Sequence, residues 1–155
     1  TGMHRANRLA SNSLLEGLVV GGRAGAAAAA HAGSAGPVLA CVSQSFRAPA
    51  LDRAELQRAM SADASVVRDA DGLQRLVGIL ATARPRTVDN RTDFEDVALT
   101  MTARAVAAAA AERTESRGCH HRADHPETDA AQAKSITVRV DAAGLPTVSA
   151  PAGVR

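Results

Sequence analysis

Apolar positions at helical spacing first appear between residues 13 and 32. Leu14, Leu18 and the Gly21–Gly22 pair fall on one face of a helix, and the alanine run that follows has high helix propensity. Ser13 and Glu16 have the spacing of a capping box, in which the serine hydroxyl accepts a hydrogen bond from the glutamate N–H. Residues 13–32 are therefore predicted to form a helix, which the glycines and proline of HAGSAGP bring to an end.

Two further helices are predicted after residue 51. Asp52 and Glu55 open the first of them, and its apolar positions are Leu56, Ala59, Met60 and Val67. A break around Gly72 precedes the next helix, which Pro85 ends. The apolar positions of that helix are spaced i, i+3, i+4, i+7: Leu73, Leu76, Val77 and Leu80.

A fourth helix, predicted to be the longest, covers about residues 93–116. Thr92 and Glu95 have capping-box spacing at its start, and Gly118 is a typical C-terminal cap. Residues 34–50 are predicted to be a linker. Residues 129–155 are predicted to be an irregular tail in which SITVRV and the turn DAAG can form a short β-hairpin. The predicted fold is therefore mainly α, with a bundle of about three helices in residues 51–128.

Composition supports helix-on-helix packing, because aromatic residues are limited to Phe46 and Phe94 and the apolar content is rich in alanine. All of the 18 basic residues except Lys134 are arginine, a bias typical of a GC-rich genome, and the net charge is +2. The sequence has no basic run interleaved with aromatic residues, so no nucleic-acid surface is predicted. Charged residues interrupt the longest apolar stretch, so no membrane span is predicted. Cys41 and Cys119 form no spaced framework, which favours reduced thiols and a cytoplasmic protein.

The stretch ANRLASNSLLEG combines a polar loop with the start of the first predicted helix. Free N–H groups and the positive end of the helix dipole at Ser13 can bind an anion. Arg8 adds a planar guanidinium suited to a carboxylate or phosphate. Spacing alone leaves a second interpretation open, namely an ordinary capped helix with a surface arginine.

Two motifs resemble a known family. TGMHRANRLASNSLLEGLVVGGRAG closely resembles the C-terminal flavin-binding signature of the succinate dehydrogenase/fumarate reductase flavoprotein superfamily, H-G-A-N-R-L-x-x-N-S-L. ESRGCHHRADHPETD resembles the segment E-S-R-G-x-H-x-R-x-D-x-P that follows the family's helical domain. The form A-S-N-S-L-L-E is most similar to the L-aspartate oxidase branch. The chain therefore resembles the C-terminal portion of a longer flavoenzyme.

The resemblance implies a domain organisation and an FAD site. Residues 1–33 would end an FAD-binding domain, 34–50 would be a linker, 51–128 a helical C-terminal domain and 129–155 a tail. Backbone amides of Ser13 and Leu14 would meet the flavin pyrimidine edge, with Asn12 shaping the same pocket. Arg8 would hold a substrate carboxylate, and Ser11 and His4 would line the substrate site.

The same resemblance implies an activity. The whole enzyme would oxidise L-aspartate to iminoaspartate with FAD, and oxygen or fumarate would reoxidise the flavin. The product would pass to quinolinate synthase on the route to NAD. A dehydrogenase or fumarate reductase flavoprotein subunit and a non-catalytic helical remnant are the alternatives. The chain contains neither a Gly-rich dinucleotide motif nor a catalytic residue of the family, so it is expected to be inactive alone.

The chain departs from the family pattern at Arg5, where a glycine is usual, and at His125, where an aromatic residue is usual. The second motif also contains five residues of types that can bind a metal, Cys119, His120, His121, Asp124 and His125. These residues lack the paired spacing of zinc sites, so no metal site is predicted. Instead, Arg117, His120, Arg122 and Asp124 are predicted to pin the end of the long helix to the flavin domain through charge-assisted hydrogen bonds.

Overall fold

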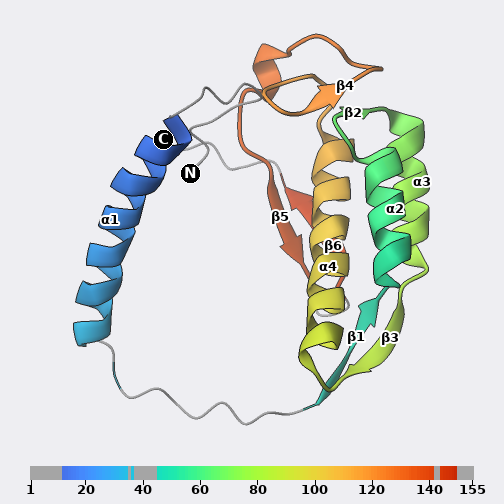
Figure 1. Ribbon diagram of the computed structural model, residues 1–155. Helices are drawn as coiled ribbons and strands as arrows, with labels where there is room; N and C mark the ends of the chain where they lie inside the picture. Colours follow the sequence, from blue (N-terminus) through green and yellow to red (C-terminus); the bar gives the residue numbers. More distant parts are fainter. Residues whose placement is uncertain (1–11, 35, 37–44, 142–143, 150–155) are drawn as a thin grey trace. The chain divides into compact units, whose positions relative to one another are not determined.

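The computed structural model describes residues 12–34, 36, 45–141 and 144–149 (Figure 1). Its contacts divide the chain into two compact units, Thr1–Gln44 and Ser45–Arg155. The division falls within the segment predicted to be a linker. The domain boundaries inferred from the resemblance remain predictions.

The first unit contains helix α1, Asn12–Ser34, which confirms the helix predicted at residues 13–32. Because α1 begins at Asn12, Ser13 lies inside its first turn and not at the N-cap position that the predicted capping box requires. Large apolar side chains on α1 are exposed to solvent: Leu14, Leu15, Leu18 and Val19. Among the described residues, no helix has the length and apolar character needed to cross a membrane.

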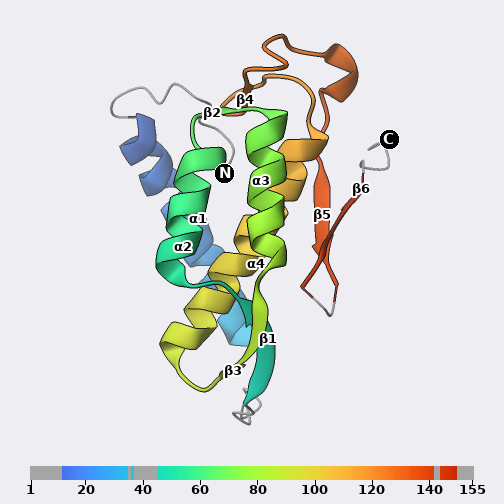
Figure 2. The same cartoon turned by 90° about the vertical axis from the view of Figure 1, so that its right-hand side faces the viewer.

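The second unit is built on α2 (Arg53–Asp63), α3 (Ala70–Ala81) and α4 (Arg91–Glu112), which confirms the predicted three-helix bundle (Figures 1 and 2). Asp52 caps α2 as predicted, because its side chain accepts hydrogen bonds from the N–H groups of Ala54 and Glu55. Asp69 caps α3, so Gly72 lies in the first turn of that helix and does not break the chain.

The predicted ends of α4 were wrong. Asn90 is the N-cap, since its side chain accepts from the N–H of Asp93, whereas Glu95 binds arginine side chains and closes no capping box. The helix ends at Glu112, and Gly118 lies in a later turn with φ of +62°. At 22 residues, α4 is also one residue shorter than the 23-residue α1.

Among the described residues of the second unit, the strands form three short two-stranded sheets. β5 (Thr137–Val140) and β6 (Pro146–Ser149) form the predicted antiparallel hairpin. β1 (Phe46–Ala50) pairs antiparallel with β3 (Arg84–Val88), and β2 (Val67–Arg68) pairs parallel with β4 (His121–Arg122). A 3-10 turn covers Ala130–Gln132. The β1–β3 and β2–β4 pairings were not predicted from the sequence, which assigned residues 46–50 to a linker and Val67 to the helix that is now α2.

The hydrophobic core lies between the three helices. Leucine and alanine side chains dominate its largest cluster, which includes Leu56, Leu76, Leu80, Ala103 and Ala107. The two phenylalanines are about half exposed, Phe46 at 47% and Phe94 at 57%. Small alanine side chains let helices approach closely, so this core needs no aromatic ring.

Candidate functional site

The flavin-loop residues fall at the edge of the described structure. His4, Arg8 and Ser11 lie outside the described residues, as does Arg5. Asn12, Ser13 and Leu14 form the start of α1. Backbone N–H groups in the first turn of a helix have no partner within the helix, and no acidic side chain lies in that turn of α1. The flavin-loop assignment therefore remains a prediction that this helix start can accommodate.

The second motif, Glu115–Asp129, forms a closed loop after α4, here called the motif loop. Its tip is a tight turn in which Arg117 and His120 exchange backbone hydrogen bonds of 2.8 and 3.0 Å. Gly118 occupies the turn with positive φ, a conformation that glycine adopts at little cost. Cys119 is exposed in the same turn.

Arg122 is the most engaged side chain of the motif loop, and it is only 2% exposed. Its Nε and Nη2 donate to the two carboxylate oxygens of Asp124 at 2.8 and 2.6 Å. Its Nη1 donates to the backbone carbonyls of Ala110 and Arg113, both at 3.1 Å, and so satisfies acceptors at the C-terminal end of α4.

Asp124 extends this link to a second helix. Its Oδ2 accepts from the N–H of Ala70, the first residue of α3, at 3.0 Å. The hydrogen bond from Arg122 is the main cause that holds the pKa of Asp124 well below its usual value. The pair therefore joins the end of α4 to the start of α3, where the positive end of the helix dipole favours a carboxylate.

Glu115 closes the base of the motif loop, and its side chain is fully buried. Arg113 and Arg117 donate to Oε1 at 2.6 and 2.8 Å, and Arg117 also donates to Oε2 at 2.9 Å. The N–H of Asp129 donates to Oε2 at 2.6 Å. These donors, with Arg117 first, lower the pKa of Glu115 to about 2. Glu115 thus ties together the two ends of the motif loop.

Ser116 organises the interior of the loop. Its Oγ accepts from the N–H of Arg122 at 2.8 Å and donates to the carbonyl of His125 at 2.8 Å. Its backbone N–H donates to the carbonyl of Glu127. The hydroxyl therefore both donates and accepts inside the loop.

His120 has its tautomer set by its neighbours. Nδ1 lies 2.9 Å from Nη1 of Arg68, and Nε2 lies 3.3 Å from the carbonyl oxygen of Arg113. Because a guanidinium can only donate, Nδ1 accepts and Nε2 carries the proton. Burial, followed by the nearby charges of Arg68, Arg122 and Arg113, lowers the pKa of His120. The ring is therefore a neutral link between the motif loop and the β2 strand.

These contacts confirm the prediction for two of the four residues, since His120 and Arg122 bond carbonyl groups at the end of α4. Arg117 binds within the motif loop, and Asp124 binds Arg122 and the start of α3. Contact of these residues with the flavin domain stays a prediction. The partners that the structure gives for Arg117, His120, Arg122 and Asp124 lie in α3, α4, β2 and the motif loop itself, all within Ser45–Arg155. Within the described part of the chain, no three His, Cys, Asp or Glu side chains are placed to bind one metal ion.

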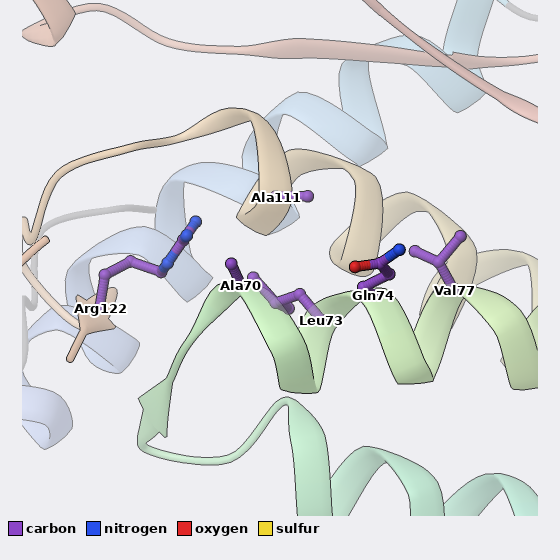
Figure 3. Close-up of a pocket in the computed structure, with 6 residues that line it drawn as sticks. All are labelled: Ala70, Leu73, Gln74, Val77, Ala111 and Arg122. Carbon is purple, nitrogen blue, oxygen red and sulfur yellow. The ribbon is translucent and has the colours of Figure 1, made fainter. Parts of the chain in front are cut away.

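A cavity of about 270 Å³ opens beside Arg122 (Figure 3). Its walls are mainly apolar and are formed by Ala70, Leu73, Gln74, Val77, Ala111 and Arg122. Figure 3 shows that Arg122 borders the cavity at the start of α3, where its guanidinium is already bonded to Asp124 and to two carbonyls. The guanidinium of Arg122 therefore already has partners within the protein, which gives this residue a structural role.

Comparison with known proteins places this arrangement in a family. Residues 53–150 match the model of the fumarate reductase flavoprotein C-terminal family. The chain is 63% identical over 143 residues to the L-aspartate oxidase of Mycobacterium tuberculosis and 62% identical over 140 residues to that of Mycobacterium leprae. Each match covers 90% of this chain and 27% of the relative, so the chain spans about a quarter of these relatives' length.

A solved structure shares the fold. Escherichia coli quinol fumarate reductase FrdA superposes with a TM-score of 0.53 at 24% identity, over 66% of this chain and 21% of that one. The family match spans the second unit from the start of α2 to the end of β6, including the motif loop. This chain therefore belongs to the fumarate reductase flavoprotein C-terminal family.

Proposed function

We propose that this chain is the C-terminal part of an FAD-dependent L-aspartate oxidase. The observation that carries the proposal is the 63% identity over 143 residues to the M. tuberculosis L-aspartate oxidase. The complete enzyme converts L-aspartate to iminoaspartate, with oxygen or fumarate as the final acceptor. Its product supplies quinolinate synthase in NAD biosynthesis, in the cytoplasm.

The proposed flavin site includes the start of α1. The N–H groups of Ser13 and Leu14 lie in its first turn, where helix geometry leaves them without intrahelical acceptors. They can donate to the oxygen and nitrogen acceptors at the pyrimidine edge, while Asn12 at the helix start shapes the pocket. Bound FAD supplies a hydride acceptor. The absence of an acidic side chain from the first turn leaves the helix dipole free to favour negative charge there.

The substrate is a dicarboxylate, and this chain contributes groups that bind it. Arg8 holds one carboxylate through paired N–H donors, which a guanidinium presents in a planar fork. Ser11 and His4 line the same site. We place no catalytic residue in this chain, and the 155 residues alone are proposed to be inactive, because several flavin contacts of about 1 kcal/mol each do not offset the cost of association.

A flavoprotein subunit of a succinate dehydrogenase or fumarate reductase is the second candidate, favoured by the family match and by the shared fold with the E. coli fumarate reductase. The two candidates differ in substrate. L-aspartate carries the amine that an amino-acid oxidase converts to an imine, whereas succinate has no amine.

The test uses the longer polypeptide that contains this chain, purified with FAD. Peroxide release with L-aspartate is measured beside dye reduction with succinate. The proposal predicts aspartate-dependent peroxide and little succinate activity. Succinate oxidation without aspartate activity would transfer the assignment to the second candidate. Fluorescence titration of the 155-residue chain with FAD tests the separate proposal that it does not bind the cofactor at micromolar concentration.

A further inference from the structure

A second cavity of about 410 Å³ lies between α3, α4 and the β5–β6 hairpin. The hairpin lies alongside α4 in both views (Figures 1 and 2). Apolar side chains make up most of the cavity wall, notably Val77, Leu80, Ala108, Leu145 and Pro146, and Arg104 completes it. Its volume is in the range of pockets that hold small organic ligands.

Arg104 is the charged group in this wall, and it is only 6% exposed. Its Nη1 donates to the carbonyl of Gly144 at 2.8 Å and its Nη2 to the carbonyl of Leu80 at 3.0 Å. In the described part of the chain, none of the ion pairs includes Arg104. Carbonyl oxygens accept its protons but carry no full negative charge, so an anion would complement this buried cation.

Gly144, just before β6, lies against this guanidinium. Gly144 has φ of +75°, and a Cβ at this position would lie 3.2 Å from Nη1 of Arg104. The backbone of Gly144 therefore lies close to Arg104, where an added side chain would be tightly packed. This approach holds Leu145 and Pro146 at the mouth of the cavity, where Leu145 is 52% exposed.

We propose that this cavity binds a small amphipathic carboxylate. Its carboxylate lies against Arg104, and its apolar body lies between Val77 and Ala108 under Leu145. The proposal is independent of the flavin and of the oxidase activity, because it depends only on residues of the second unit.

The chain contains no tryptophan and no tyrosine, so an indole ligand can be followed without protein background. The probes are indole-3-propionate, its neutral amide and the cation tryptamine, which share one ring and differ in the head group. Fluorescence anisotropy with the 155-residue chain gives each Kd. We expect the carboxylate to bind about tenfold or more tightly than the amide, the usual advantage of a charged partner, and tryptamine to bind weakest.

Three variants locate the site. Arg104→Gln should make carboxylate and amide bind equally, and Ala108→Leu should fill the cavity and abolish binding of both. Ala62→Leu, on the exposed face of α2, should change nothing. Methyl resonances of Val77, Leu80 and Leu145 should shift when indole-3-propionate is added to the wild-type chain.

The proposal is overturned if the carboxylate and the amide bind the wild-type chain equally, or if no binding occurs at millimolar concentration. It is also overturned if the methyl shifts occur elsewhere. If circular dichroism shows that Arg104→Gln unfolds the chain, Ala108→Leu and the methyl shifts decide, because neither removes the buried arginine.

Discussion

The guanidinium of Arg122 and the carboxylate of Asp124 form a two-point ion pair across one intervening residue, with N–O distances of 2.8 and 2.6 Å. The geometry is notable because the arginine also bonds the end of α4 and the aspartate the start of α3. One pair therefore sets how two helices of the bundle meet the motif loop.

Removing this arginine should destabilise the second unit strongly. Arg122→Met leaves the α4 carbonyls and Asp124 without their donor, and we expect a loss of about 3 kcal/mol in the free energy of unfolding. Urea denaturation followed by far-UV circular dichroism measures the change. Arg91→Gln is the matched control, because the Arg91 side chain is 91% exposed in its pair with Glu95 and its loss should leave the midpoint nearly unchanged. Equal effects of the two variants would contradict the structural role of Arg122.

Acid should weaken the motif loop through Glu115. The pKa of Glu115 is about 2 in the folded chain, against the ordinary value of 4.5 that applies in the unfolded chain. On acidification the unfolded chain therefore takes up the proton first. The stabilisation by Glu115 is present above about pH 4.5 and is lost as the pH falls towards 2. Urea midpoints at pH 5, 4 and 3 should therefore decline in the wild type. Glu115→Gln should be less stable than the wild type at pH 7, and its urea midpoint should decline less steeply between pH 5 and 3. If the midpoints of the variant and the wild type decline equally, Glu115 is not a source of the acid sensitivity.

His120 should weaken the same region at milder pH. Its folded pKa lies below 6.5, so the unfolded chain binds the proton first and stability falls as the pH drops through that value. A proton on Nδ1 would also face Arg68 and break their hydrogen bond. The His120 Cε1–H resonance should titrate below pH 6.5. His120→Asn keeps an acceptor for Arg68 without the charge, so its stability between pH 7 and 5.5 should be flatter than that of the wild type. A titration midpoint of the His120 imidazole at or above pH 6.5 would contradict its assignment as a neutral ring that accepts from Arg68.

Alanine substitutions at three glycines should distinguish the effect of backbone strain from that of helix propensity. Gly144→Ala should cost at least 1 kcal/mol, because the φ of +75° is strained for alanine and the new Cβ meets Arg104 at 3.2 Å. Gly118→Ala has the strained φ of +62° with open space around it, and should cost about 1 kcal/mol. Gly78→Ala, inside α3 with nothing within 4 Å, should stabilise by about 0.5–1 kcal/mol. Thermal denaturation ranks the three variants, and a stable Gly144→Ala would show that the hairpin turn does not depend on close approach to Arg104.

In the longer polypeptide, Arg8→Leu should impair the use of dicarboxylates far more than the binding of FAD. In its proposed role Arg8 pairs with a substrate carboxylate, and loss of one partner of such a buried pair costs roughly 2–5 kcal/mol, or about 30-fold to several thousand-fold in kcat/KM. Steady-state kinetics with L-aspartate and the flavin content of the purified variant measure the two effects. An unchanged kcat/KM would remove Arg8 from the substrate site.

The sequence by itself determined the helices and the hairpin, because their signals are local. Leu73, Leu76 and Leu80 mark the buried face of α3, and the Asp52 side chain caps α2 within three residues along the chain. Both effects act over a turn or two and are readable from spacing. Local signals also misled: Thr92 and Glu95 have the right spacing for a capping box, but the helix starts earlier, and the Asn90 side chain caps α4. Glu95 instead binds Arg91 and Arg53, the latter 42 residues away.

Tertiary structure alone decided the contacts between distant segments. β1 (FRAPA) pairs with β3 (RPRTV), although neither segment has the apolar alternation typical of a strand. The two segments form a sheet only because the folding of the chain between them brings them together. The same holds for the Arg68–His120 link across 52 residues and for the burial of Arg104 under a turn 40 residues away. A guanidinium on a helix is exposed by default, and the packing of α3 and of the β5–β6 hairpin against α4 removes this one from water.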